Sequence, residues 1–404
     1  MEFDLVKARA DTPGVAHVVH VNNAGASLTP RVVTEAMTQH LEPESRIGAY
    51  EAAERAQGSI DHAHEAIATP INAKRQEIAI LDSATRAWGM AVAGIPFRAG
   101  DRILASPVEY GSNHILLVHL AERLGVSLEF LPLDANGLVD VAELENRLDE
   151  RVKLIAMAHV PMHDGLVNPV AEVGALARGS GALFIVDACQ SAGHLPVDVR
   201  RIGCDLLVGS GRKFLRGPRG TGFLYVRQAV ASRLTPAVLG LDGVRWHSGT
   251  YHLAPGAPRF ETWEVDAAAR IGLGVAVDYA LQWGVEHTWR RVRHLAAGLR
   301  ERLAAVPGVR VEDRGVERCG NVAVTFRDLD PFDVRAELLR RGINTWVCLD
   351  NAACHDMQLR GLSRLLRVSV HYYNTEEEAE RLCSALEALA SGRAAAGRTA
   401  GAFA

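Results

Sequence analysis

Short apolar runs alternate with segments of helical spacing between residues 77 and 209, and this alternation constrains the fold most. Six runs have strand length: EIAIL (77–81), RILAS (102–106), SLEFLPL (127–133), KLIAMAHV (153–160), ALFIVD (182–187) and DLLVG (205–209). Helical spacing occupies residues 86–95, 113–124, 141–148 and 169–177. Strands that alternate with helices predict an α/β fold with a mostly parallel sheet covered on both faces.

The rest of the chain divides into further segments. A further strand, GFLYVRQ (222–228), precedes a loose connector at 229–262 and a long apolar helix at Asp266–Trp283. Residues 284–391 then read as helix, strand (NVAVTFR), helix, strand (INTWV), strand (LLRVSV) and helix. We therefore predict a large domain over 21–283, a small α+β domain over 284–391 and a disordered tail over 392–404.

Composition argues against several classes of partner. The 404 residues carry a net charge of -4, which gives no basic excess for nucleic acid. No segment approaches the roughly 18 apolar residues of a membrane span, and MEFDLVKARADTPG lacks the pattern of a signal peptide. The six cysteines show neither a CxxC pair nor metal-ligand spacing. We expect a cytoplasmic enzyme without metal, nucleic acid or membrane partners.

Ligands of open parallel sheets bind beyond the carboxyl ends of the strands, so the loops after the strands are the place to search. After EIAIL come Ser83, Ala84 and Thr85, just before a helix. Their N–H groups and hydroxyls suit an anion at the positive helix end, although ordinary N-capping is the commoner explanation for such residues taken alone.

A carboxylate follows the apolar run ALFIV. Asp187 ends this strand, where a buried charge is costly unless it meets a cation or hydrogen-bond donors. A protonated ring nitrogen would meet that need, and Gln190 could reach another polar atom of the same ring. The alternative is a carboxylate that caps the next helix.

The stretch GSGRKFLRGPRGTG (209–222) contains one of only four lysines, the others being Lys7, Lys74 and Lys153. Phe214 follows Lys213 where a Walker loop needs Ser or Thr. The glycines lead into a strand rather than a helix, which disfavours a Rossmann fingerprint. A lysine, a strand-end carboxylate and anion ligands at Ser210 and Arg212 together match the needs of pyridoxal phosphate (PLP): a Schiff-base lysine, a partner for the pyridine nitrogen and donors for the phosphate.

The pair FIVDACQSAGHLPVDV and GSGRKFLRGPRGTGFLYV resembles the fold-type I, class V aminotransferase superfamily, in the branch of cysteine desulfurase-like and isopenicillin N epimerase-like enzymes. The resemblance runs from VNNAGASLTP (21–30) to RVSVHYYNTEEE (367–378). It implies a mostly parallel seven-stranded sheet, a small C-terminal α+β domain and an N-terminal segment, residues 1–20, packed on the small domain. It also implies a homodimer with active sites at the subunit interface.

The resemblance further implies a role for each matching residue. Lys213 would be the catalytic, cofactor-bearing lysine, Asp187 the partner of the pyridine nitrogen and Gln190 that of the phenolic oxygen. Tyr110 would stack on the ring and Arg367 would bind the substrate carboxylate. Phosphate positions fall on Ala84, Thr85, Ser210 and Arg212, and the substrate region includes Asn23 and Gly25.

Three departures from the desulfurase pattern bear on the reaction. In desulfurases, one segment reaches the cofactor phosphate in the partner subunit, and here RFETWE (259–264) stands in its place. Trp263 and Glu264 are therefore either contacts to the partner's cofactor or residues that pack in the interface. Met162 stands where desulfurases carry an Asn. The two polar residues that follow it, His163 and Asp164, are either substrate contacts or part of a solvated loop. Cys348 and Cys354 precede the substrate arginine but lack the motif around the desulfurase's nucleophilic cysteine, and buried packing is the alternative.

These departures favour a PLP-dependent carbon–sulfur β-lyase that acts on an S-substituted cysteine and releases a thiol, pyruvate and ammonia. In the branch that the chain resembles, such lyases serve small-thiol pathways and sulfur-containing antibiotic assembly. Decarboxylation, epimerisation and cysteine desulfuration share the same cofactor contacts and remain alternatives. A non-catalytic binding protein is the alternative outside enzymes, and the complete set Asp187, Gln190, Lys213 and Arg367 argues against it.

Overall fold

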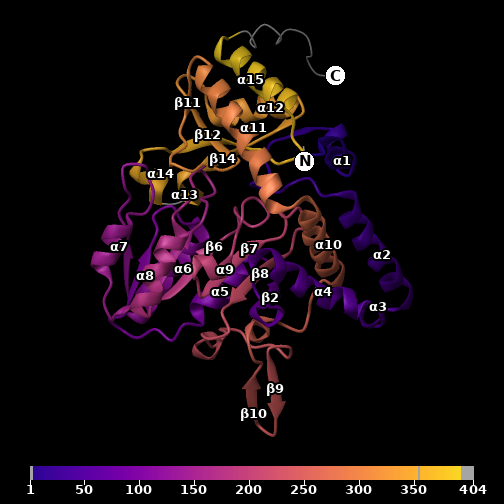
Figure 1. Cartoon of the computed structure of the whole chain (residues 1–404), viewed down its shortest axis with the longest axis vertical. Helices are drawn as coiled ribbons and strands as arrows, with labels where there is room; N and C mark the ends of the chain where they lie inside the picture. Colours follow the sequence, from indigo (N-terminus) through magenta and orange to yellow (C-terminus); the bar gives the residue numbers. More distant parts are fainter. Residues whose placement is uncertain (1–2, 354, 393–404) are drawn as a thin grey trace, which may run out of the picture.

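The computed structural model describes residues 3–353 and 355–392, and its centre is one seven-stranded sheet (Figure 1). The strand order is β2-β8-β7-β6-β5-β3-β4. The strands are β2 (Ile78–Leu81), β3 (Arg102–Ala105), β4 (Ser127–Phe130), β5 (Val152–Ala158), β6 (Leu183–Asp187), β7 (Leu206–Ser210) and β8 (Gly222–Val226). Only β8 is antiparallel to its neighbours, which confirms the predicted α/β fold with a mostly parallel sheet.

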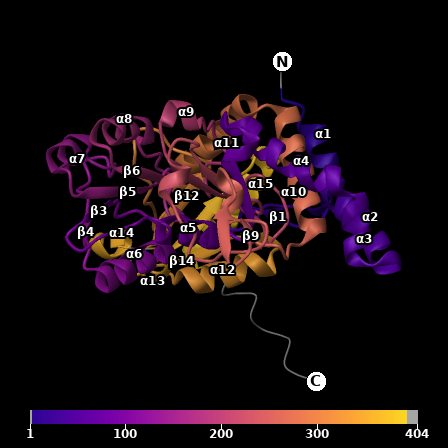
Figure 2. The same cartoon turned by 90° about the horizontal axis from the view of Figure 1, so that it is seen from below.

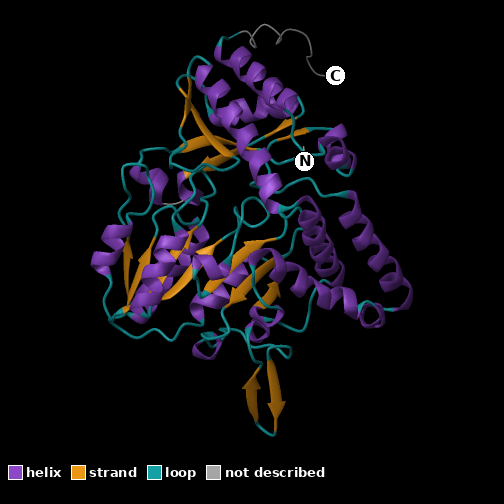
Figure 3. Cartoon of the chain, in the orientation of Figure 1, coloured by secondary structure: helices purple, strands orange, loops and turns teal. Residues whose placement is uncertain are grey.

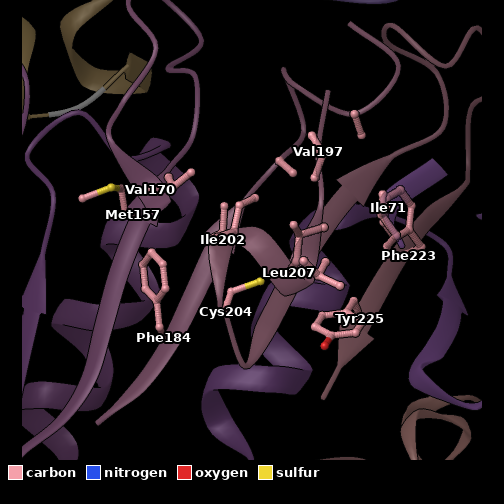
Figure 4. Close-up of a cluster of buried hydrophobic side chains, with 14 of the residues drawn as sticks. Ile71, Met157, Val170, Phe184, Val197, Ile202, Cys204, Leu207, Phe223 and Tyr225 are labelled. Atoms are coloured by element: carbon pink, nitrogen blue, oxygen red, sulfur yellow. The ribbon is translucent and has the colours of Figure 1, made fainter. Parts of the chain in front are cut away.

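Alternate residues of every strand except the edge strand β4 enter two different cores, as the two-residue period of a strand requires. In β6, Phe184 and Val186 pack into one core, which Figure 4 shows in part, whereas Leu183 and Ile185 pack into the other. Each fully buried side chain of this size contributes about 1.5–3 kcal/mol. Burial on both faces explains why the strands are continuous apolar runs.

Helices cover both faces of this sheet (Figure 3). On one face pack α5 (Ala84–Ala93) and α6 (Gly111–Leu124). The other face is covered by α4 (Gln57–Ala68), α7 (Val141–Arg147), α8 (Val170–Ser180), α9 (Val199–Ile202) and α10 (Ala267–Trp283). Two more helices, α2 (Arg31–Ile47) and α3 (Ala49–Arg55), lie at the opposite end of the molecule from α7 (Figure 2).

A second sheet has its own core. The antiparallel order is β11-β12-β15-β14, formed by β11 (Val309–Val311), β12 (Asn321–Phe326), β15 (Arg364–Ser369) and β14 (Trp346–Leu349). Three helices pack on it: α11 (Val285–Ala305), α12 (Pro331–Arg340) and α15 (Glu376–Ala390). Ala8 of α1 (Leu5–Ala10) joins the same core. The domain boundaries stay a prediction; the break between α10 and α11 falls at Gly284.

Two expectations about strands are wrong. INTWV is not one strand: β13 (Ile343–Asn344) pairs in parallel with β1 (Val19–His20), while β14 joins the four-stranded sheet. The connector is not irregular throughout, because β9 (Val244–His247) and β10 (Thr250–Leu253) form a hairpin that projects from the body (Figure 1). Its two-residue turn, Ser248–Gly249, has φ of 46° and 86°, the positive values that such hairpins need.

Among residues 3–353 and 355–392, no helix is both long and apolar enough to cross a bilayer. Within the same residues, no group of three or more His, Cys, Asp or Glu side chains is arranged to hold a metal ion.

Candidate functional site

A cavity of about 510 Å³ opens beyond the carboxyl ends of the parallel strands and reaches the four-stranded sheet. Residues far apart in the chain line it, since strand ends, helix starts and β15 converge there. The predicted site residues that line the cavity are Gly25, Ala84, Thr85, Tyr110, Asp187, Gln190, Ser210, Arg212, Lys213 and Arg367.

The glycine-rich turn after β7 presents Lys213 to this cavity. The Gly217 N–H donates to the Gly211 carbonyl over 2.7 Å, and the Gly211 N–H donates to the Thr221 carbonyl over 3.1 Å. A Cβ at Gly211 would lie 2.2 Å from the Thr221 hydroxyl oxygen, so a side chain does not fit there. The glycines therefore serve close packing of the turn, as expected from the sequence.

Arg216 ties the same turn to distant parts of the chain. It is almost fully buried and has a φ of 61°, a left-handed conformation that needs support from its surroundings. Its guanidinium donates to the Tyr372 hydroxyl over 2.7 Å and to the Thr12 hydroxyl over 2.6 Å. These bonds hold the turn with Lys213 against the N-terminal segment and the residues after β15.

The electrostatic setting of Lys213 favours the loss of a proton from its amine. Burial lowers its pKa, and the positive charges of Arg212 and Arg367 lower it further, against the opposing effects of Cys189 and Asp187. A neutral amine is the nucleophilic form of lysine, so this position suits covalent chemistry with a carbonyl group.

Asp187 is buried and fixed by two donors. Its Oδ1 accepts the Cys189 N–H over 2.8 Å, and its Oδ2 accepts the Asn113 side-chain amide over 2.9 Å. Gln190, nearby, donates through Nε2 to the Ala24 carbonyl over 3.2 Å, while its buried Oε1 has no partner among the described residues. Nε2 has a second hydrogen, and its predicted donation to a phenolic oxygen stays a prediction.

One end of the cavity is built for an anion. The Ser83 hydroxyl caps α5 by accepting the Arg86 N–H over 3.2 Å, which leaves Ala84 and Thr85 in the first turn. A Cβ at Gly222 would lie 2.4 Å from the Ser83 carbonyl carbon, so only glycine allows β8 to approach this helix start. Free N–H groups of a helix start, with Arg212 beside them, favour bound phosphate.

Arg367 lies at the other end, on β15. It is 2% exposed and donates to the Met162 carbonyl over 2.6 Å and to Asn22 Oδ1 over 3.1 Å. Its Nε is buried and finds no acceptor in the described part of the chain. A buried guanidinium with an unused donor at a cavity wall fits a small carboxylate.

Together these groups fit PLP. The cavity offers an amine for the cofactor's carbonyl carbon, a carboxylate for its pyridine nitrogen and a helix start with a cation for its phosphate. The unpartnered buried atoms of Gln190 and Arg367 add two unused polar contacts in the same cavity.

Two predicted substrate contacts do not line the cavity. The Asn23 side chain is fully buried and donates to the Ser369 carbonyl over 2.8 Å, so it connects the N-terminal segment to β15. His163 is also fully buried, and its Nε2 lies 2.8 Å from Asp356 Oδ2. Asp164 is not solvated either, because it is buried and paired with Arg314.

The residues expected at an interface lie outside this cavity. Trp263 is 58% exposed, and Glu264 lines a neighbouring pocket of about 170 Å³. Their predicted contacts with a partner subunit stay a prediction. Cys348 is buried among Ala323, Met357 and Leu365, while Cys354 lies outside the described residues.

The sequence interpretation missed several lining residues, among them Asn113, Cys189, Arg219 and Trp346. A signal for Asn113 was present, because it lies in the first turn of the helix after β3, at the edge of the sheet where ligands of parallel sheets bind. Trp346 carried no such signal. Only the pairing of β14 with β15 brings it opposite Arg367.

Comparisons with known proteins agree with this geometry. The family model for the class-V aminotransferases matches residues 19–382. A probable cysteine desulfurase of Methanothermobacter thermautotrophicus is 32% identical over 95% of this chain and 97% of its own length. The cysteine desulfurase of Thermococcus onnurineus in its apo form superposes with a TM-score of 0.90 at 29% identity, covering 97% of this chain and 99% of that one.

A second enzyme type also shares the fold. A cystine C–S lyase, solved with its reaction product cysteine persulfide, has a TM-score of 0.84 at 25% identity and covers 93% of this chain and 99% of that one. The family model spans most of the residues that form the cavity, from the strand before Asn22 to α15. The chain therefore belongs to the class-V aminotransferase family, whose members use PLP.

Proposed function

We propose that the protein is a PLP-dependent β-lyase that cleaves the carbon–sulfur bond of an S-substituted cysteine. The net reaction converts the substrate and one water into a thiol, pyruvate and ammonium, without oxidation or reduction. The observation that carries the proposal is the state of Cys348, which lies near Arg367 but is buried.

A desulfurase needs a cysteine thiolate that can reach the substrate sulfur. Burial raises the pKa of Cys348, although Arg367 acts in the opposite direction, so the thiol stays protonated and enclosed. Cys348 lies on β14, and the second helix after this strand, α14 (His355–Leu359), is anchored by Asp356, which is 1% exposed and paired with His163 and Arg314. These contacts support a chemistry that does not depend on a moving cysteine.

Cys189 is the other cysteine to consider, since it lines the cavity. Burial and the negative charge of Asp187 raise its pKa well above the ordinary value, against the effect of Lys213. Its N–H is bonded to Asp187, which fixes its backbone. A protonated thiol on a fixed backbone is a poor acceptor of sulfur.

When bound, PLP supplies an electron sink that stabilises negative charge at the substrate's α carbon. Lys213 would hold the cofactor, and its amine would also take up the α proton of the substrate. Asp187 would keep the pyridine nitrogen protonated, and Tyr110 would stack on the ring. Arg367 would orient the substrate through its carboxylate.

Phosphate contacts would come from Ala84, Thr85, Ser210 and Arg212. Arg219 also lies at this end, since its charge lowers the pKa of Arg212 after the larger effect of burial. Two arginines near one helix start favour a doubly charged phosphate over a carboxylate.

Cysteine desulfuration is the second candidate, because both the relative from Methanothermobacter and the structure from Thermococcus are named for that activity. The similarity to a cystine C–S lyase supports the first candidate. The two reactions differ in product: desulfuration yields alanine and leaves sulfur on the protein, whereas β-elimination yields pyruvate.

We further propose a homodimer in which the projecting hairpin and the segment with Trp263 and Glu264 contact the partner. Trp246 of β9 is 67% exposed, Tyr251 of β10 is 48% exposed and Trp263 is 58% exposed. Large exposed aromatic side chains are typical of interfaces. The small pocket lined by Glu264 shares Asp82 and Thr221 with the cavity, which supports an interface beside the candidate site.

The test of the function is a product analysis. The purified protein, reconstituted with PLP, is incubated with S-alkyl cysteines, and pyruvate, carbon dioxide, aldehyde, inverted amino acid, alanine and sulfide are measured. We expect pyruvate and thiol in equal amounts, and no product with Lys213→Ala. Carbon dioxide or alanine without pyruvate would contradict the lyase assignment.

A further inference from the structure

One side-chain amide bridges two buried carboxyl groups behind the cavity. Asn113 Nδ2 lies 3.0 Å from Glu109 Oε1 and 2.9 Å from Asp187 Oδ2. All three side chains are buried: Glu109 is 0% exposed, Asn113 2% and Asp187 6%. Each hydrogen of the amide is therefore used by one carboxyl group.

The fold brings the three residues together from separate elements. Asp187 ends β6, while Asn113 lies in the first turn of α6 and Glu109 lies two residues before that helix, in the loop after β3. β5 separates β3 from β6 in the sheet, so the first turn of α6 must cross the end of β5 to reach Asp187. Glu109, in the loop before α6, is held at that turn by the Tyr110 N–H, which donates to its Oε1 over 2.9 Å.

Glu109 is suited to hold Asn113 rather than to bind a cation. Its Oε1 accepts both the Tyr110 N–H, over 2.9 Å, and the Asn113 amide. Its buried Oε2 has no hydrogen-bond partner among the described residues, and no ion pair of Glu109 occurs within them. Burial, and then the charge of Asp187, raise the pKa of Glu109 to about 8, so it is neutral at pH 7.

This charge state leaves Asp187 as the single anion of the group. With Oε1 accepting two bonds, the proton of Glu109 belongs on Oε2. The amide then links a neutral acid to a charged carboxylate, and the second bond to Asp187, from the Cys189 N–H, fixes the other oxygen. Both oxygens of Asp187 accept hydrogen bonds, so its carboxylate cannot rotate without breaking one of these hydrogen bonds.

We propose that Glu109, acting through Asn113, is a positioning residue that orients Asp187 toward the pyridine nitrogen of the cofactor. The inference rests on the proposed PLP function. Neither Glu109 nor Asn113 takes part in the chemistry; they set the direction of the lone pairs that Asp187 offers to the ring. Their effect is therefore read best in the protonation of the ring nitrogen.

The experiment is ¹⁵N nuclear magnetic resonance of the protein loaded with PLP that is ¹⁵N-labelled in the ring. Wild type is compared with Asn113→Ala, Glu109→Ala and Glu109→Gln over a range of pH. We expect both alanine variants to lower the pH at which the ring nitrogen loses its proton by about one unit or more, the equivalent of one hydrogen bond to a charged group. Glu109→Gln keeps an acceptor for Asn113 and should behave like wild type.

A matched control is Asn374→Ala. The Asn374 amide donates to a buried carboxylate oxygen of Glu378 over 2.8 Å, and Asn374 does not line the cavity. Loss of a comparable bond there should leave the ring-nitrogen signal unchanged. If the alanine variants do not fold, Asn113→Ser and Glu109→Gln are compared instead. The serine side chain is too short to bridge both carboxyl groups, so Asn113→Ser should lower the pH midpoint of the ring nitrogen, whereas Glu109→Gln should not.

Two results would overturn the inference. Alanine variants that keep the wild-type signal and pH midpoint would mean that Asp187 needs no support from Asn113. A Glu109→Gln variant that behaves like Glu109→Ala would mean that the acid group itself, not the orientation of Asn113, matters. A wild-type protein that binds no PLP would instead refute the proposed function, a failure visible before any variant is compared.

Discussion

Trp346 and Arg367 lie directly opposite each other on the antiparallel strands β14 and β15. Opposite residues of such a pair point to the same face of the sheet, and here both line the cavity. The Arg335 guanidinium lies 5.1 Å from the centre of the Trp346 ring, and the tryptophan is 45% exposed. A substrate whose carboxylate binds Arg367 would therefore extend its sulfur substituent past the free ring surface of Trp346.

Replacement of Trp346 should change the choice of substituent. We expect Trp346→Ala to raise KM for S-aryl or S-benzyl cysteine roughly tenfold, because a stacked aromatic contact contributes about 1 kcal/mol beyond its buried area. S-methyl cysteine should be affected much less. Phe332→Ala is the control, since Phe332 is 46% exposed but does not line the cavity. An equal change in KM for both substrates would show that the sulfur substituent does not contact Trp346.

Arg367→Lys tests the carboxylate contact. A lysine cannot reproduce the planar fork of donors, so kcat/KM should fall about 10- to 100-fold or more, as expected for a lost charge-assisted hydrogen bond. The visible absorption of the bound cofactor should persist, because the lysine that would hold the cofactor, Lys213, is unchanged in this variant. A variant with unchanged steady-state kinetics would show that the substrate carboxylate binds elsewhere.

His163 is expected to act on stability rather than on substrate binding. Burial by itself would raise the pKa of Asp356, but the hydrogen bond from His163 and the charges of Arg314 and Arg360 hold it below its usual value. His163→Ala leaves that buried carboxylate with fewer partners and should cost about 3–5 kcal/mol in urea unfolding.

The control for that variant is Arg75→Ala. Arg75 and Asp61 form a half-exposed ion pair over 3.1 Å, and its loss should change stability by about 1 kcal/mol or less. A His163→Ala protein of normal stability but raised KM would restore His163 as a substrate contact.

Glu109 predicts a pH dependence of stability. Its pKa is about 8 in the folded protein, against an ordinary value of 4.5, so the folded state binds more protons between these values. The wild type therefore loses stability as pH rises through this window, whereas Glu109→Gln cannot ionise. In cofactor-free protein, the variant should gain roughly 2–4 kcal/mol over wild type between about pH 5 and about pH 8.5.

Urea unfolding at the two pH values measures that difference. Glu122→Gln, on the exposed side of the same helix, should show a difference that does not depend on pH. A constant difference between Glu109→Gln and wild type would mean that Glu109 is already ionised at low pH.

Local patterns predicted the main sheet and the groups at its edge. The strands with residues buried on both faces were recognisable as apolar runs; Asp187 ends one of them, and Lys213 lies three residues after another. Lysine is also rare in this chain, which made Lys213 conspicuous. These features depend on neighbours along the chain, so the sequence carries them.

Features that depend on distant pairing were not predictable in this way. His163 looks like a polar loop residue, and only the position of Asp356, far along the chain, shows it to be buried. INTWV reads as one strand, although Thr345 separates a pair in one sheet from a strand in another. The bond of Asn113 to Asp187 likewise requires α6 to cross the sheet edge.

The most direct test of the central claim uses the cysteines. Wild type and a Cys348→Ala, Cys354→Ala double variant, with Cys189→Ala as a separate variant, are each loaded with PLP and given S-alkyl cysteine and cysteine in parallel. Pyruvate, alanine, released thiol and protein-bound persulfide are then quantified. The proposed lyase predicts equimolar thiol and pyruvate from S-alkyl cysteine, at rates that survive in the variants. Alanine and persulfide from cysteine, both lost in the double variant, would contradict it and identify a desulfurase.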